Sequence, residues 1–156
     1  MIIPIHYKIK GKQMNRRDAL KMAGVAAMMT AVSAEAKMAT EHMNRTEMKP
    51  KDPKNMDKGE LKHTPQITIK EKDEKGFALV EINIGQGGII HPSTADHWID
   101  FIELYADDKL VGKTSLEPEL SRGLTAFAVK LDNVKTLKAR SGCNLHGIWT
   151  STTPVS

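Results

Sequence analysis

Four histidines and one cysteine are the side chains after residue 60 best suited to bind a transition metal. They are His63, His91, His97, Cys143 and His146, and Cys143 is the only cysteine of the 156-residue chain. Imidazole nitrogens combined with one thiolate suit zinc, copper or iron. We therefore expect a site that holds one metal ion.

The spacing of these residues favours one shared site over five unrelated side chains. A single histidine in a loop is usually solvated, and a single cysteine is usually a small buried apolar residue. Here, Cys143 and His146 are separated by two residues and flanked by glycines, and His91 and His97 enclose a loop that contains Pro92. A free thiol in an oxidising compartment is a liability unless a metal occupies it.

The number of donors distinguishes between the candidate metals. A structural zinc site is complete with four ligands, and five are available. A blue-copper site uses two histidines, one cysteine and commonly a methionine, but every methionine lies at or before Met56. On iron, four nitrogens and one sulfur leave a sixth position open, as in a haem with a thiolate ligand, where a small oxygen species binds.

The elements that position these residues read as short strands. Apolar and polar residues alternate or form β-branched runs, and turn residues separate the runs. The expected strands cover residues 66–70, 77–84, 98–105, 110–116, 124–131, 134–140 and 147–152. Seven short strands predict an all-β sandwich over residues 61–156. Residues 98–105 would also suit a helix, but their aromatic residues favour a strand.

The N-terminal part has a different composition. Residues 1–36 contain six Lys/Arg and two Asp/Glu, whereas residues 37–156 contain 17 of each, so the folded part offers no basic surface for nucleic acid. Arg16 and Arg17, a short apolar run and Ala34-Glu35-Ala36 indicate a twin-arginine-type signal peptide, with translation starting at Met1 or at Met14. Residues 37–60 lack branched aliphatic residues and are expected to form a disordered polar linker.

Three motifs together resemble the superoxide reductase family, also called neelaredoxin or desulfoferrodoxin. The motifs are Lys62-His63-Thr64-Pro65, His91-Pro92 with His97, and Cys143-Asn144-Leu145-His146-Gly147-Ile148-Trp149. The resemblance implies an immunoglobulin-like sandwich and one iron with His63, His91, His97 and His146 in a plane and Cys143 axial. It also implies reduction of superoxide to hydrogen peroxide, with electrons from a carrier such as rubredoxin. A chain with one cysteine lacks the additional four-cysteine iron domain and corresponds to the single-iron type.

The residues before His63 carry both an expected catalytic group and a departure from the family pattern. Lys62 matches the family's lysine, and a cation beside an open iron attracts a small anion and stabilises bound peroxide. The family commonly has Glu before this lysine, and its carboxylate can occupy the sixth iron position. Here that position is Leu61, and in an extended segment Glu60 would point the opposite way. We therefore expect water, hydroxide or an empty position in the oxidised state.

Further expectations concern tuning, partners and location. Backbone N–H groups of Asn144 and Leu145 are expected to hydrogen-bond the sulfur of Cys143. The expected partners are superoxide and a rubredoxin-like or other electron donor, and exposed sheet edges make a homo-oligomer reasonable. The signal predicts a periplasmic protein, tethered to the membrane if the signal is retained. The alternatives are a periplasmic metal-binding or electron-transfer protein without catalysis, and an immunoglobulin-like binding module without metal.

Overall fold

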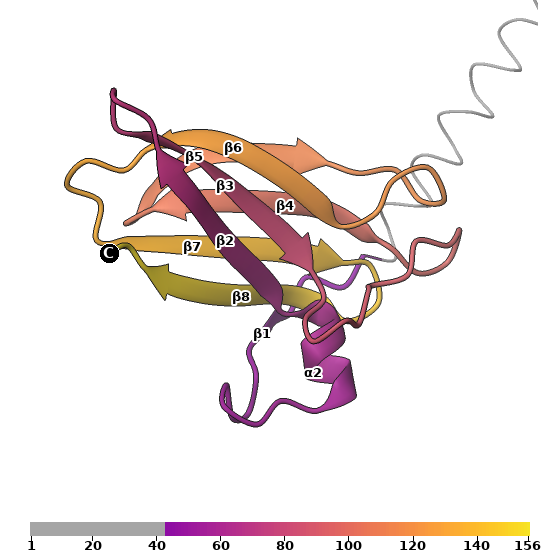
Figure 1. The fold of residues 1–156 in the computed structure, drawn as a ribbon. Helices are drawn as coiled ribbons and strands as arrows, with labels where there is room; N and C mark the ends of the chain where they lie inside the picture. The colour runs from indigo at the N-terminus through magenta and orange to yellow at the C-terminus, as the bar shows by residue number, and fades with distance from the viewer. Residues whose placement is uncertain (1–42) are drawn as a thin grey trace, which may run out of the picture. The chain divides into compact units, whose positions relative to one another are not determined.

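The computed structural model describes residues 43–156, which form a β-sandwich with one short helix (Figure 1). A sheet of five strands has the order β1-β8-β7-β4-β5, and a sheet of three strands has the order β2-β3-β6. The elements are β1 (Glu47–Met48), α2 (Lys58–His63), β2 (Pro65–Lys72), β3 (Phe77–Ile84), β4 (Ile99–Ala106), β5 (Lys109–Ser115), β6 (Leu124–Lys130), β7 (Thr136–Cys143) and β8 (Gly147–Pro154). The predicted all-β sandwich is confirmed, and each of the seven expected strands is present.

The core between the two sheets is built from alternate residues of the strands. In β3, Val80, Ile82 and Ile84 face inward and are almost fully buried. From the opposite sheet, β7 contributes Leu137 and Ala139 to the same core. Burying a large aliphatic side chain of this kind stabilises the fold by about 1.5–3 kcal/mol. The resulting rigid sandwich supports the loops at its ends.

Strand β4 shows why its sequence also suited a helix. The pairing of β4 with β7 shifts register between Ile99 and Phe101, which marks a β-bulge or similar irregularity. Ile99 and Ile102 both enter the core although they are three positions apart. A spacing of three is typical of a helix, so the irregularity gives a strand a helix-like pattern.

Residues 43–60, which we expected to belong to a disordered linker, have a defined structure instead. Strand β1 pairs in parallel with β8. Helix α2 begins at the N-cap Asp57, whose carboxylate accepts the N–H of Glu60, and the Glu60 carboxylate accepts the N–H of Asp57. This reciprocal pair is a capping box. The segment is ordered by hydrogen bonds and by packing on the sandwich, and neither requires the branched aliphatic residues that it lacks.

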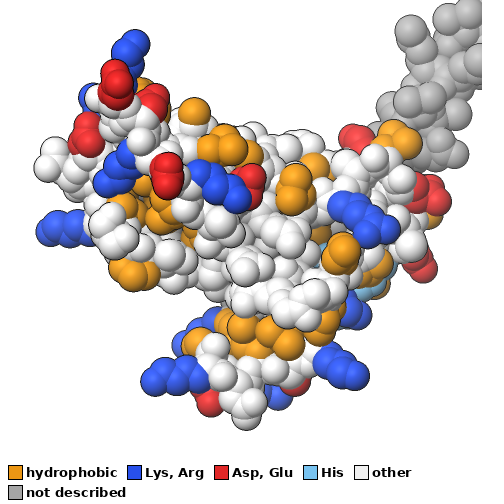
Figure 2. Space-filling view, viewed as in Figure 1, with side chains coloured by type: hydrophobic (Ala, Val, Ile, Leu, Met, Phe, Trp, Pro, Cys, Tyr) orange, Lys and Arg blue, Asp and Glu red, His pale blue; other side chains and the backbone are white. Residues whose placement is uncertain are grey.

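The segment before α2 also presents apolar side chains to the sandwich. Pro50, Pro53 and Met56 line a cavity of about 430 Å³ together with Pro65 and Ile67 of β2. Figure 2 shows apolar side chains gathered where the part of the chain that contains this segment and α2 meets the sandwich. Apolar residues of this segment and of β2 therefore face one shared cavity.

The expected signal peptide at residues 1–36 and the first residues of the expected linker lie outside the described residues. Within residues 43–156, no helix has the length and apolar character needed to cross a bilayer.

Replacing Asp57 tests the contribution of the capping box. Asp57→Ala should lower the free energy of unfolding by about 1 kcal/mol, because the N–H of Glu60 loses its acceptor. Urea unfolding of the metal-free protein measures this change. Lys58→Ala, at an exposed position of the same helix, is the control and should change stability by less than about 0.5 kcal/mol. An equal loss in both variants would contradict the capping role.

Candidate metal centre

The side chains of the five predicted donors lie close together. The elements that carry them meet at one end of the sandwich (Figure 1). His63 is the last residue of α2, and Cys143 is the last residue of β7. His91 and His97 lie in the connection between β3 and β4, and His146 lies in the turn between β7 and β8. Residues from four separate places in the chain therefore contribute to one site.

The four imidazole rings form a closed, four-sided arrangement. Adjacent ring centroids are 4.8 Å apart for His63 and His91, 4.6 Å for His91 and His97, 4.8 Å for His97 and His146, and 4.6 Å for His146 and His63. The diagonal from His63 to His97 is 6.0 Å. Nearly equal sides are what four ligands arranged around one ion require.

The donor atoms have the spacing of ligands that share an ion. Nδ1 of His146 lies 3.1 Å from Nε2 of His63, 3.2 Å from Nε2 of His97 and 3.4 Å from Sγ of Cys143. A single ring nitrogen has one proton or one lone pair and cannot satisfy three such neighbours. Nitrogen ligands lie about 2.1 Å from a metal such as zinc, so adjacent ligands are about 3 Å apart. The spacing therefore fits one metal ion.

His91 completes the set in a different way. The donor atoms of His63, His97, Cys143 and His146 all lie within 4.8 Å of one another, and His91 is not part of this tighter group. Nε2 of His91 is nevertheless buried without a hydrogen-bond partner among the described residues. A buried polar atom without a partner costs about 1–3 kcal/mol, and a metal ion would remove that cost.

Backbone carbonyls orient two of the rings. Nδ1 of His63 donates to the carbonyl of Gly59 at 2.6 Å, and Nδ1 of His91 donates to the carbonyl of Pro92 at 2.7 Å. These bonds leave Nε2 of both rings free for a metal. Together with the contacts above, they make Nε2 the donor of three histidines and Nδ1 the donor of His146.

The electrostatics of the centre favour neutral imidazoles. Burial lowers the pKa of His63 to about 4 and that of His91 to about 3, against the opposite effect of their hydrogen bonds to carbonyls. Burial also lowers the pKa of His97, and the charges of His146 and Lys62 act in the same direction. A neutral imidazole is the form that binds metals. These three rings therefore bind an ion near neutral pH without first losing a proton.

The sulfur of Cys143 is fully buried, and two backbone groups point to it. Burial raises the pKa of the Cys143 thiol, and hydrogen bonds from the N–H groups of His146 and Leu145 act against this rise. The prediction was right for Leu145 and wrong for Asn144. The N–H of Asn144 donates instead to the carbonyl of Trp98 at 3.1 Å.

Asn144 connects two ligand-bearing loops. Its Nδ2 donates to the carbonyl of Asp96 at 2.7 Å, and its Oδ1 accepts the N–H of Trp98 at 2.9 Å. Asp96 and Trp98 are the neighbours of His97. These two hydrogen bonds fix the position of the loop that carries Cys143 relative to the loop that carries His97.

Glu60 lies on a helix, not in the extended segment that we expected. Its carboxylate is buried and accepts the N–H groups of Lys51 at 2.9 Å and Asp57 at 3.0 Å. Both carboxylate oxygens are therefore occupied away from the four rings. The capping geometry, rather than strand alternation, argues against Glu60 as a metal ligand.

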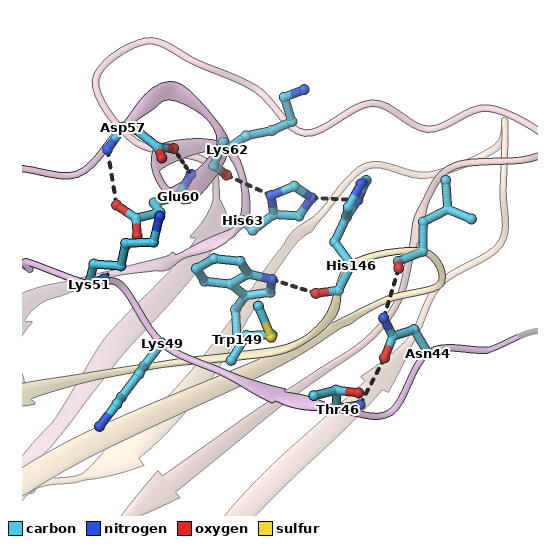
Figure 3. Close-up of a pocket in the computed structure, with 13 residues that line it drawn as sticks. Asn44, Thr46, Lys49, Lys51, Asp57, Glu60, Lys62, His63, His146 and Trp149 are labelled. Carbon is cyan, nitrogen blue, oxygen red and sulfur yellow. Dashed lines mark hydrogen bonds between the residues drawn. The ribbon is translucent and has the colours of Figure 1, made fainter.

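Lys62 precedes His63 and lines a cavity of about 540 Å³ that borders His63 and His146. In Figure 3 its side chain extends above the rings of His63 and His146, away from Lys49 and Lys51. Lys62 therefore brings a positive charge to the accessible side of the centre.

Sequence reasoning missed two supporting residues. The Trp149 ring stacks on His63 with centroids 5.4 Å apart and an angle of 19°, and its Nε1 donates to the carbonyl of His146 at 3.0 Å. Trp149 belongs to the last motif, but no role was predicted for it. Asn44 contacts the Cys143 loop from the segment that we expected to be disordered. A single asparagine in a polar segment carries no signal of such a contact.

Comparisons with known proteins agree with this geometry. The Desulfoferrodoxin family model matches residues 55–152. A superoxide reductase from Pyrococcus abyssi is 37% identical over 101 residues, which cover 59% of this chain and 84% of the relative. A solved superoxide reductase (neelaredoxin) from Ignicoccus hospitalis is 27% identical with a TM-score of 0.55, and the match covers 75% of this chain and 96% of that one. A single-iron superoxide reductase from Giardia intestinalis is 28% identical with a TM-score of 0.51, over 60% of this chain and 98% of that one.

Proposed function

This chain belongs to the desulfoferrodoxin family, and we propose that it is a superoxide reductase of the single-iron type. The reaction combines superoxide, one electron and two protons to give hydrogen peroxide. The observation that carries this proposal is the convergence of four imidazoles and one sulfur on a single point. A non-catalytic metal-binding protein is not favoured, because the named relatives are superoxide reductases.

Iron fits the donor set. His63, His91 and His97 would hold it through Nε2, His146 through Nδ1 and Cys143 through Sγ. The unpartnered Nε2 of His91 would thereby gain a partner. Bound iron supplies one electron to superoxide and changes from the ferrous to the ferric state, while thiolate donation favours this transfer.

The protein residues guide the small anion to one side of the centre. Cys143 is buried, His97 is partly exposed and His146 is exposed, so solvent reaches the ring side and not the sulfur side. Lys62 lies on that open side and attracts an anion electrostatically. Water held by the Lys62 ammonium group supplies protons to the product, and solvent access lets the peroxide leave.

The electron donor, assembly and location remain part of the proposal. A rubredoxin-like or other carrier delivers an electron at the exposed edge near His146. The exposure of His146 supports this, because a carrier docked there would be close to the metal. The edge strands β2, β5 and β6 support homo-oligomer formation. Arg16, Arg17 and the apolar run after them support periplasmic export, with membrane tethering if the signal is retained. An immunoglobulin-like strand topology is supported by the two-sheet sandwich.

Cys143→Ser tests the sulfur ligand. The variant should lose the visible thiolate-to-iron(III) absorption and its superoxide-dependent peroxide production, because a serine oxygen does not replace thiolate donation. Absorption spectroscopy, metal analysis and peroxide yield under a superoxide flux measure these effects. Circular dichroism shows whether the variant is folded. A folded variant that keeps both the absorption and the turnover would refute the assignment.

Lys62→Ala tests electrostatic attraction. The association rate with superoxide should fall about tenfold at low salt, and its dependence on ionic strength should weaken. Pulse radiolysis at several salt concentrations measures both quantities. Lys109→Ala removes the same charge from an exposed position of the hairpin between β4 and β5 and should leave the rate unchanged. Equal rates in the parent protein and the Lys62 variant would rule out steering by Lys62.

Glu60→Gln tests whether a carboxylate closes the sixth iron position. The variant should keep the visible spectrum of the oxidised protein, because both Glu60 oxygens are engaged in backbone hydrogen bonds. An optical pH titration of the parent and the variant provides the comparison. A pH-independent carboxylate-type spectrum in the parent that disappears in the variant would show that Glu60 is a ligand.

A further inference from the structure

The segment 43–51 contacts the metal-binding loop although it lies before the part matched by the family model. The N–H of Asn44 donates to the carbonyl of Asn144 at 2.7 Å. Its side-chain Nδ2 donates to the carbonyl of Leu145 at 2.9 Å. Asn44 therefore binds two consecutive carbonyls of the loop between Cys143 and His146. Figure 3 shows the hydrogen bonds of its side chain.

These two carbonyls belong to the peptide groups that face the sulfur. A peptide plane contains the carbonyl of one residue and the N–H of the next. The carbonyl of Asn144 shares its plane with the N–H of Leu145, and the carbonyl of Leu145 shares its plane with the N–H of His146. These are the two N–H groups that hydrogen-bond Cys143. Asn44 thus holds the far end of both peptides that donate to the sulfur.

The approach of the segment to the loop is close. Gly147 has a φ of +84°, and a Cβ at this position would collide with the carbonyl oxygen of Thr46. That carbonyl accepts the N–H of Ile148 at 2.8 Å. Oδ1 of Asn44 accepts the N–H of Thr46 at 2.9 Å, which fixes the Asn44 side chain itself. Both donors of Asn44 are therefore aimed at the loop by local structure.

We propose that Asn44 is a positioning residue that controls the electron-donating strength of the Cys143 thiolate by holding the peptide groups of Leu145 and His146. A hydrogen bond to a carbonyl polarises the N–H at the other end of the same peptide. A polarised N–H withdraws more electron density from a sulfur ligand, and hydrogen bonds to sulfur set the potential of thiolate-bound iron. Asn44 is not one of the five residues that would hold the iron. The inference rests on the proposed iron centre.

Other contacts hold the segment on the sandwich, so the role of the Asn44 side chain can be tested without detaching the segment. Arg45 pairs with Asp100 at 2.6 Å, and Glu47 pairs with Arg140. Strand β1 also keeps its pairing with β8. A change in the Asn44 side chain therefore leaves the segment attached and removes the bond to Leu145.

Full-length variants of Asn44 test the proposal. Asn44→Ala removes the Nδ2 donor and the Oδ1 acceptor, whereas Asn44→Asp keeps an acceptor for Thr46, removes the donor to Leu145 and adds a negative charge. Both variants should shift the thiolate-to-iron(III) absorption to longer wavelength and make the reduction potential more negative, because the sulfur gains electron density. Iron release to a chelator should become about tenfold faster. Asn55→Ala is the matched control, since Asn55 is exposed in the connection between β1 and α2.

Hydrogen exchange provides a readout that does not need iron. In the metal-free protein, the amide of His146, which shares its peptide with the Leu145 carbonyl, should exchange faster in both Asn44 variants and at the parental rate in Asn55→Ala. Unchanged absorption, potential and exchange in folded Asn44 variants would overturn the proposal. A parent protein that binds no iron or makes no peroxide would instead overturn the proposed function, and the exchange comparison would still decide the role of Asn44 in holding the loop.

Discussion

The centre depends on placing four rings and one sulfur around one point, and no single helix, strand or loop carries all five donors. Each donor comes from the end of a strand, from a helix end or from a connection, so the sandwich fixes positions but not orientations. Orientation comes from single hydrogen bonds, such as those from His63 to Gly59 and from His91 to Pro92. A ring without such a bond could rotate and present the wrong nitrogen. The carbonyls behind the rings are therefore as important as the rings themselves.

The sequence predicted the features that depend on short-range patterns. The alternation in β3 marks a strand with one buried face, and the structure places this strand at residues 77–84 as expected. The donor types were equally readable, because thiolate and imidazole chemistry belongs to the residue and not to its surroundings. The helix-like spacing of Ile99 and Ile102 was ambiguous for a physical reason, since the register shift near Ile99 changes the period of a strand.

Features that depend on distant hydrogen bonds were not predicted. Asn44 and Leu145 are 101 positions apart, and neither residue has an unusual neighbourhood in the sequence. Helix α2 was missed because its six residues have little apolar periodicity. Its capping signal, Asp57 with Glu60 three positions later, is present in the sequence but was not recognised within a segment of polar composition. We expected Glu60 to lie in an extended segment, one residue away from the position of the family's glutamate. In the structure its buried carboxylate caps helix α2 instead.

The buried sulfur links these observations. Burial raises the pKa of the Cys143 thiol, and the N–H groups of His146 and Leu145 act against this rise. A bound metal ion would favour the thiolate further. The metal is held by residues within the family motifs, but the orientation of the donors is also fixed from outside the matched region by Asn44. Ligand identity and ligand strength are therefore set by different parts of the chain. Substitutions before the first motif can alter the electronic properties of the centre while all five ligands stay the same.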